Sequence, residues 1–300
     1  MKKSDEYTFE NIMKLQAETL ETWYEDYDKM QQTQLWEDGA PGFDETYGQR
    51  QPSIAVIPGS KNEQNGAVII CAGGGFVFKS FFEGRSVAEK FASMGFCAAV
   101  LDYRVNPYTQ YDMMEDAKRA VRLLRSNAGE WNINPEKITI LGFSAGGQIA
   151  ALTGTKFDNG NPEALDPIDR NSCRPDAVIS CYSSLSFCSS PEPNTDLENL
   201  GGVYTREDRI NLSAEKNINL ETPPFFIWGT VEDEALDQRY MLQFASALSD
   251  MEVPFELHLF EKGPHGMGLC DETCPLIPKP NAHAGRWVEL CVEWLKEKGF

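Results

Sequence analysis

Residues 138–152 read ITILGFSAGGQIAAL, and this stretch decides the fold. Three of the first four residues are apolar and the fourth is a β-branched threonine, which predicts a strand, and Gln148 to Leu152 predict a helix. The turn between them carries glycines, which allow a strand and a helix to approach closely. A serine in the pattern Gly-x-Ser-x-Gly between a strand and a helix is typical of a nucleophile in a strained turn. We therefore predict that Ser144 is a nucleophile; the alternative is a glycine-rich turn without chemistry.

Two groups of backbone amides are candidates for stabilising an oxyanion. The predicted helix points its N-terminus at Ser144, so the Ala145 amide can donate to a developing negative charge. Upstream, Ala72-Gly-Gly-Gly-Phe76 ends another apolar run. Three successive glycines lose much backbone entropy on folding, which indicates amides that face a ligand, and we predict an oxyanion hole from Gly73, Gly74 and Ala145. A phosphate-binding loop is the alternative, but the spacing fits neither common phosphate-binding pattern.

The general base can be sought among only three histidines. His265 lies in Gly-Pro-His-Gly-Met-Gly, a loop directly after the last predicted strand, where it can reach over the serine. His258 alternates within that strand and reads as a structural or solvent-facing residue. His283 begins the last predicted helix and is the second candidate.

The acid is expected after the predicted strand at 225–228, in a loop with four carboxylates. Asp233 stands three residues before Leu236, the spacing of an Asp turn that leads into the next element, and Glu232 is the alternative. The task of this acid would be to hold the histidine in the correct tautomer and to stabilise the imidazolium. The order serine, acid, histidine is the one that accompanies a Gly-x-Ser-x-Gly elbow.

Strands and helices alternate along most of the chain. This alternation predicts the α/β class, with a mainly parallel central sheet flanked by helices in a three-layer sandwich. Residues 51–300 are predicted to form the catalytic domain, with a loop-rich insertion at about 154–220 near the site. Further strands are expected at 67–72, 97–103, 177–181, 225–228 and 255–260, and further helices at 85–94, 112–126 and 284–298.

Residues 1–50 form an N-terminal extension with an amphipathic helical pattern. We expect its aromatic stripe to pack on the main domain, with a lid or a dimer contact as alternatives. The stripe consists of Phe9, Met13, Leu20, Trp23, Tyr27 and Met30.

Composition excludes several classes of partner. The formal net charge is −19, and such a surface repels nucleic-acid phosphates and anionic lipid. We find no signal peptide and no apolar run of membrane-spanning length, and the eight cysteines do not form a disulfide pattern, so we expect a cytoplasmic protein. Cys270 and Cys274 are a close pair, but zinc-ligand spacing is absent elsewhere. We expect neither a metal nor a cofactor.

With these motifs in place, the chain from about residue 67 to its C-terminus resembles α/β-hydrolase esterases related to bacterial acetyl xylan esterases, and more distantly hormone-sensitive-lipase-like enzymes. The similar segments are Cys-Ala-Gly-Gly-Gly-Phe at 71–76, Phe-Glu-Gly-Arg at 82–85, Leu-Asp-Tyr-Arg-Val at 101–105, Gly-Phe-Ser-Ala-Gly-Gly at 142–147, Arg-Pro-Asp at 174–176, Thr-Pro-Pro-Phe-Phe-Ile-Trp at 222–228 and Gly-Pro-His-Gly-Met-Gly-Leu at 263–269.

The resemblance implies a Ser144–Asp233–His265 triad and the removal of small acyl groups, such as acetyl, from xylan-derived oligosaccharides. The chain departs from the family pattern at Ala72, Gly229 and Glu232, none of which is a triad member. The expected partner is a small-molecule or oligosaccharide ester, and a homodimer is an option. The alternatives are a general short-chain carboxylesterase, a peptidase of the same fold and a binding protein with a dead site.

Overall fold

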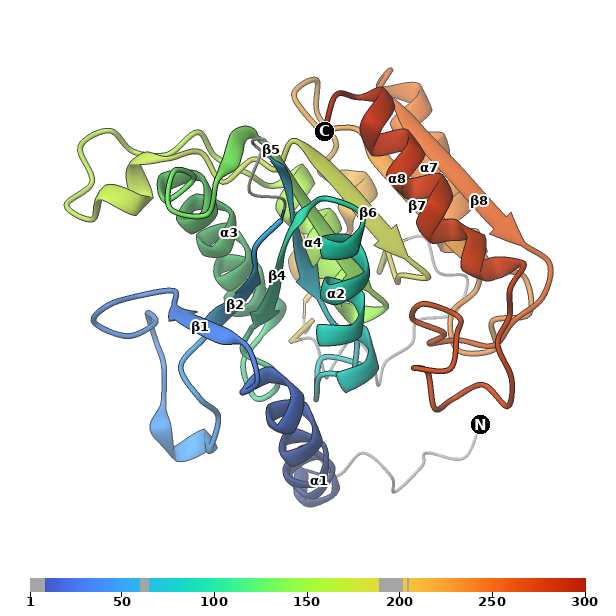
Figure 1. Cartoon of the computed structure of the whole chain (residues 1–300), viewed down its shortest axis with the longest axis horizontal. Helices are drawn as coiled ribbons and strands as arrows, with labels where there is room; N and C mark the ends of the chain where they lie inside the picture. Colours follow the sequence, from blue (N-terminus) through green and yellow to red (C-terminus); the bar gives the residue numbers. More distant parts are fainter. Residues whose placement is uncertain (1–8, 60–64, 189–201, 204) are drawn as a thin grey trace.

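An eight-stranded sheet runs through the centre of the molecule, with helices on both of its faces (Figure 1). The computed structural model describes residues 9–59, 65–188, 202–203 and 205–300. The strand order is β1-β2-β4-β3-β5-β6-β7-β8; the first two pairs are antiparallel and the remaining pairs parallel. This mainly parallel sheet between helices confirms the predicted fold class. The strands are β1 (Gln31–Gln34), β2 (Ser53–Ile57), β3 (Asn65–Cys71), β4 (Cys97–Asp102), β5 (Ile133–Phe143), β6 (Ala177–Cys181), β7 (Phe225–Thr230) and β8 (Phe255–Phe260).

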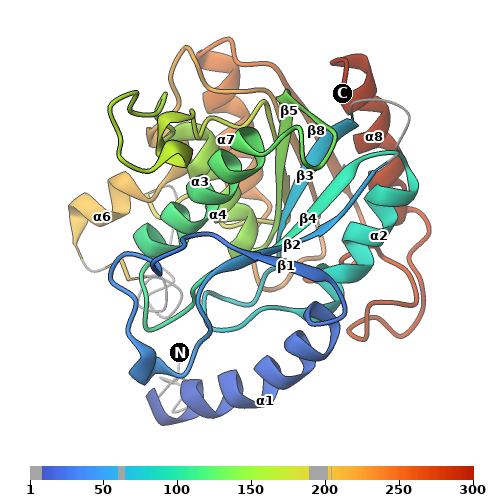
Figure 2. The same cartoon turned by 60° about the vertical axis from the view of Figure 1, so that its left-hand side comes forward.

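Different helices cover the two faces of the sheet (Figure 2). Successive residues of a strand point to opposite faces, and so Ile69 and Ile140 pack with α3, α4 and α7, whereas Ile70 and Leu141 pack with α2 and α8. All four side chains are fully buried. The helices are α1 (Phe9–Tyr27), α2 (Arg85–Ser93), α3 (Gln110–Ser126), α4 (Ala145–Thr155), α6 (Arg206–Asn211), α7 (Arg239–Asp250) and α8 (Trp287–Glu297).

The strands β1 and β2 lie at one end of the sheet and were not predicted. The sequence of β1, QQTQ, has no apolar residue, and its side chains are mostly exposed. It pairs with β2 through its backbone, in a register that places Gln31 opposite Val56. An edge strand has one free side and little apolar surface to bury, so hydrophobic periodicity does not detect it.

The helix α1 packs on the main body of the protein through its C-terminal half. Trp23 and Tyr27 are each only 2% exposed and belong to the same apolar cluster as α2 and α8. The indole nitrogen of Trp23 donates to Asp102 Oδ1 at 3.0 Å, and the Tyr27 hydroxyl lies 3.0 Å from Ser53 Oγ. The side chains of Phe9 and Met13 lie outside the described residues. The aromatic side chains that are described therefore contact the ends of β4 and β2.

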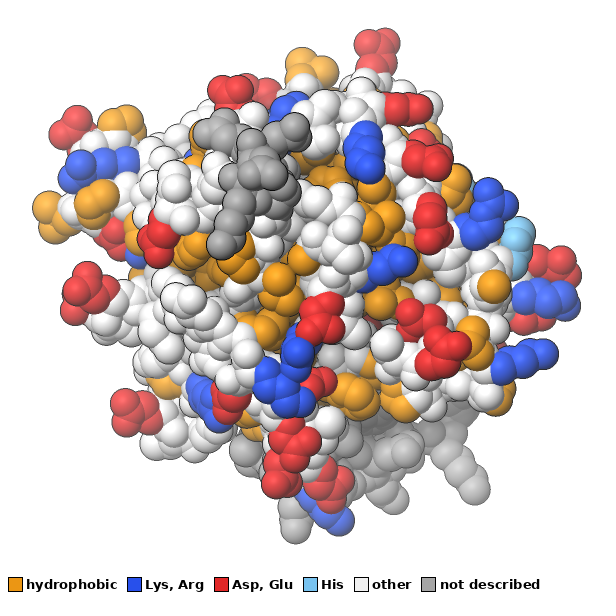
Figure 3. Space-filling model, viewed as in Figure 1, with side chains coloured by type: hydrophobic (Ala, Val, Ile, Leu, Met, Phe, Trp, Pro, Cys, Tyr) orange, Lys and Arg blue, Asp and Glu red, His pale blue; other side chains and the backbone are white. Residues whose placement is uncertain are grey.

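Charged side chains are spread over the surface. On the face drawn in Figure 3, acidic and basic groups are interspersed with uncharged ones. Within the described part of the chain, no helix combines the length and the apolar character that crossing a bilayer requires.

Candidate active site

Ser144 stands at a sharp turn between the end of β5 and the start of α4. Its backbone has φ 50° and ψ −117°, a left-handed conformation that is strained for a residue with a side chain. Its amide donates to the carbonyl of Cys181 at the end of β6, at 2.9 Å. The neighbouring strand thus holds the turn in its strained form, and the hydroxyl projects beyond the carboxyl end of the sheet.

The glycines of the turn are required by close backbone contacts. A Cβ on Gly142 would overlap the carbonyl oxygen of Gly146, and a Cβ on Gly146 would overlap that of Cys71 on β3. A Cβ on Gly147 would overlap the hydroxyl of Ser183. These overlaps are the physical reason for the glycine pattern around Ser144, since each is closer than real Cβ contacts allow.

The structure brings the three predicted polar side chains into one hydrogen-bonded chain. His265 Nε2 lies 2.8 Å from Ser144 Oγ, and His265 Nδ1 lies 2.7 Å from Asp233 Oδ2. Ser144 follows β5, Asp233 follows β7 and His265 follows β8, so all three lie at the carboxyl ends of parallel strands, where open α/β sheets bind ligands. In this arrangement the imidazole can accept the serine proton, while the carboxylate accepts a hydrogen bond from Nδ1–H and stabilises the imidazolium that forms.

Asp233 is fixed in position by its own loop. Its Oδ1 accepts hydrogen bonds from the amides of Ala235 at 2.9 Å and Leu236 at 2.8 Å, so Oδ2 is left to face His265. The Asp233 side chain is 2% exposed, against 24% for His265. The edge of the imidazole contacts the ring of Tyr182, with centroids 5.2 Å apart.

The alternative candidates from the sequence lie elsewhere. Glu232 pairs with Lys262 at 3.5 Å and accepts from the Gly263 amide at 3.2 Å. His258 pairs with Glu256. The ring of His283 packs edge-on against Phe260.

The glycine loop after β3 lies against the nucleophile. A Cβ on Gly73 would come within 3.1 Å of Ser144 Cβ, but the Gly73 amide is engaged, because it donates to Glu83 Oε2 at 2.7 Å. The carbonyl of Gly73, which shares a peptide plane with the Gly74 amide, accepts from the Ser80 amide at 2.9 Å, and this fixes that plane. Within the described residues, neither the Gly74 amide nor the Ala145 amide has a hydrogen-bond acceptor.

Sequence reasoning missed a buried pair beside this loop, Glu83 and Tyr182. The Tyr182 hydroxyl donates to Glu83 Oε1 at 2.6 Å and accepts from the Gly268 amide at 2.9 Å. Burial raises the pKa of Glu83, although its hydrogen bonds from Tyr182 and Gly73 act in the opposite direction. Glu83 and Tyr182 are 99 positions apart in the sequence, so no local pattern signals their contact.

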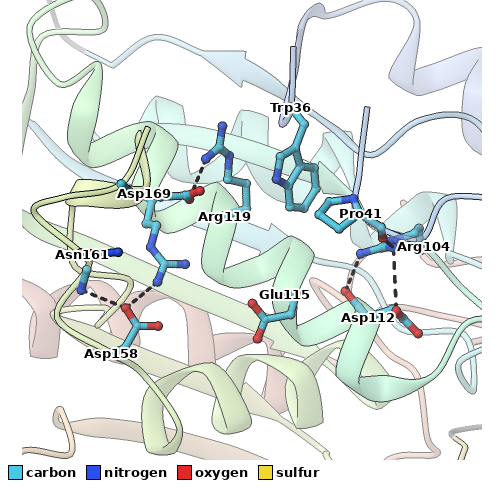
Figure 4. A pocket seen from close by; sticks show the side chains of 12 residues that line it. Trp36, Pro41, Arg104, Asp112, Glu115, Arg119, Asp158, Asn161 and Asp169 are labelled. Carbon is cyan, nitrogen blue, oxygen red and sulfur yellow. Dashed lines mark hydrogen bonds and ion pairs between the residues drawn. The ribbon is translucent and has the colours of Figure 1, made fainter. Parts of the chain in front are cut away.

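A hollow of about 670 Å³ lies over the outer side of α3, away from Ser144 (Figure 4). Its arginines are already paired: Arg119 contacts Asp169 at 2.7 Å, and Arg122 contacts Asp158 at 2.5 Å. These ion pairs tie residues 158–169, the first part of the predicted insertion, to α3. The hollow is lined by Trp36, Pro41, Arg104, Asp112, Glu115, Arg119, Arg122, Asp158, Gly160, Asn161, Ala164 and Asp169, and thus by no residue of the Ser144 site.

Comparison with known proteins places the chain among esterases. Residues 55–248 match the family model described as BD-FAE. The chain is 30% identical over 245 residues to endo-1,4-beta-xylanase B of Butyrivibrio fibrisolvens, covering 79% of the chain and 38% of that protein. It is 24% identical over 222 residues to an acetylxylan esterase of Xylanibacter ruminicola, covering 72% of the chain and 43% of that protein. The chain thus spans less than half the length of these curated relatives.

A solved structure is similar over nearly its whole length. It is an acetyl ester-xyloside bifunctional hydrolase from Caldicellulosiruptor lactoaceticus, with a TM-score of 0.83 and 34% sequence identity. The match covers 90% of this chain and 97% of that one.

Proposed function

The chain belongs to the BD-FAE family and has the α/β-hydrolase fold, and from this premise we propose that it is a serine carboxylic-ester hydrolase. The observation that carries the proposal is the unbroken contact chain from Ser144 Oγ through His265 to Asp233. These are the three residues that the sequence predicts as the triad.

The proposed reaction has two acyl-transfer steps. His265 Nε2 takes the proton of Ser144 as Oγ attacks the ester carbonyl, and the resulting imidazolium is stabilised by Asp233. The imidazolium then gives this proton to the departing alcohol, and an acyl-enzyme ester forms on Oγ. In the second step His265 takes a proton from water, whose oxygen attacks the acyl carbon, and returns the proton to Ser144. The products are a carboxylic acid and an alcohol.

We infer that the oxyanion is held by the amides of Gly74 and Ala145. Ala145 follows Ser144 in the chain, and Gly74 follows Gly73, which lies against Ser144. Neither amide has a hydrogen-bond acceptor within the described residues. Each donor of this kind lowers the barrier by about 3–4 kcal/mol. The Gly73 amide was expected to contribute directly, but its hydrogen bond to Glu83 supports a role in orienting the loop instead.

For the substrate, we propose acetyl or other small acyl esters of carbohydrates. The support is that the acetylxylan esterase and the acetyl ester-xyloside hydrolase named above are similar to this chain. A general short-chain carboxylesterase is the second candidate. Turnover of acetyl, butyryl and octanoyl nitrophenyl esters, followed by acetylated xylo-oligosaccharides, separates the two. Faster turnover of the octanoyl ester than of the acetyl ester would contradict carbohydrate deacetylation.

The nucleophile can be tested with a fluorophosphonate, which reacts covalently with activated serines. We expect labelling of the wild type and of Ser93→Ala, whose serine is exposed on α2, and no labelling of Ser144→Ala. Ester turnover should follow the labelling. A folded wild-type protein that neither reacts with the probe nor cleaves nitrophenyl acetate would contradict the proposed function.

We also propose a cytoplasmic location. All eight cysteines are free thiols, seven of them buried, as is common where disulfides do not persist. Cell fractionation with an antibody to the protein tests this location.

A further inference from the structure

We propose that Glu83 is a positioning residue, whose carboxylate couples the oxyanion loop to the histidine loop. This inference rests on the proposed esterase function. Glu83 Oε2 accepts the Gly73 amide at 2.7 Å, and Oε1 accepts the Tyr182 hydroxyl at 2.6 Å. The same hydroxyl accepts the Gly268 amide at 2.9 Å, three residues beyond His265. One carboxylate thereby connects loops that follow β3 and β8.

On the oxyanion side, the carboxylate decides which amide is available. Gly73 lies between Glu83 and the nucleophile, since a Cβ there would come within 2.8 Å of Glu83 Oε2 and 3.1 Å of Ser144 Cβ. With its amide turned to Glu83, Gly73 presents no donor to a substrate. The next amide in the chain, that of Gly74, is the one that remains. A catalytic group displaced by about 1 Å can lose much of its effect on the reaction rate. The anchoring of Gly73 therefore affects catalysis by fixing the position of the Gly74 amide.

On the histidine side, Tyr182 transmits the position of Glu83. Its ring contacts His265 edge-on at 5.2 Å, and its backbone is held at φ 39°, outside the usual range for a tyrosine. Besides its amide contact with Tyr182, Gly268 is held through its carbonyl, which accepts a hydrogen bond from the indole N–H of Trp287 at 3.1 Å. The loop that carries His265 is therefore tied both to the core and to Glu83.

A purely structural role would be better served by an apolar side chain. Glu83 is only 2% exposed, and no basic side chain in the described part of the chain forms a hydrogen bond with it. Burying a carboxylate without a counter-ion is costly. The groups that face it are the amide of Gly73, the hydroxyl of Tyr182, Ser80 on its own loop and, at longer range, His265. What a carboxylate supplies here, and a hydrocarbon does not, is two acceptors aimed at two loops.

Glu83→Gln is the variant that tests the coupling at constant size. The carbonyl oxygen of a glutamine can still accept the Gly73 N–H, but its NH₂ group can only donate toward the Tyr182 hydroxyl. The hydroxyl proton of Tyr182 then loses its acceptor, and the charge-assisted anchor on that side is weakened. Tyr182→Phe removes the link to Gly268 and leaves the Gly73 anchor in place. Glu293→Gln, at an exposed site on α8, is the matched control.

The measurement is kcat and KM for nitrophenyl acetate, with active sites counted by fluorophosphonate titration. We expect kcat per titrated site to fall about 10- to 100-fold in Glu83→Gln, because a displaced oxyanion donor loses part of its effect. KM should stay within about threefold, because ground-state binding does not use the oxyanion contacts. Tyr182→Phe should show the same split, and Glu293→Gln should match the wild type.

The outcomes separate this inference from the proposed function. If the wild type cleaves the ester and Glu83→Gln keeps its kcat per titrated site, the positioning role is wrong and the esterase function stands. If Glu83→Gln does not fold, Tyr182→Phe decides: a lower kcat at unchanged KM supports the coupling, and an unchanged kcat overturns it. A wild type without labelling or turnover overturns the function itself.

Discussion

Replacing Asp233 by asparagine tests the proposed triad most directly, because the structure determines how the new side chain must sit. The two amides of Ala235 and Leu236 donate to Oδ1, so an asparagine keeps its carbonyl oxygen there. The alternative orientation would place its NH₂ group against two N–H donors and lose two hydrogen bonds, each worth about 1 kcal/mol. The NH₂ group therefore faces His265 Nδ1 as a donor.

This orientation forces the wrong tautomer of His265. Nδ1 must then accept, Nε2 carries the proton, and the imidazole can no longer take the proton of Ser144. We expect kcat to fall about 10⁴-fold, which corresponds to about 5 kcal/mol of barrier. The fold should persist, since both loop hydrogen bonds are kept.

The assay is kcat for nitrophenyl acetate, with thermal unfolding as a check on the fold and Asp250→Asn, an exposed residue at the end of α7, as the control. A loss of less than tenfold in Asp233→Asn would refute the assignment of the acid. If Glu232→Gln showed the large loss instead, the acid would be Glu232.

Two further predictions concern stability. Trp23→Ala should lower the free energy of unfolding by about 3–5 kcal/mol, because it empties a buried indole site and removes the hydrogen bond to Asp102. In denaturant titration, Lys14→Ala on the exposed side of α1 should change little, and equal effects of the two variants would contradict the packing of α1. Burial raises the pKa of Asp116 to about 6 from 3.8, despite its contacts with Arg104. Between about pH 4 and 6 the Asp116 carboxyl is therefore mostly protonated in the folded state and mostly ionised in the unfolded state. Wild-type stability should therefore fall relative to Asp116→Asn as the pH rises from about 4 to 6, and parallel stability curves would show that the pKa is not raised.

Several features of the fold could be predicted because they depend on neighbouring residues. The apolar runs predicted most strands and helices of the parallel part of the sheet, and α3 is found at Gln110–Ser126 against an expected 112–126. The polar strand β1 was missed because its stability comes from pairing with β2. β5 begins at Ile133 rather than at residue 138, and its first residues are not continuously apolar.

The sequence by itself determined the nucleophile turn, the glycine loop and the order of serine, acid and histidine, because these patterns express backbone geometry within a few residues of one another. Only the tertiary structure decided which carboxylate and which histidine meet at Ser144. Asp233 and Glu232 are adjacent in the chain and both carry a carboxylate, but the Asp233 carboxylate contacts His265 and the Glu232 carboxylate contacts the Gly263 amide. The buried contact of Glu83 with Tyr182 was likewise beyond the sequence, since strand order sets which loops become neighbours.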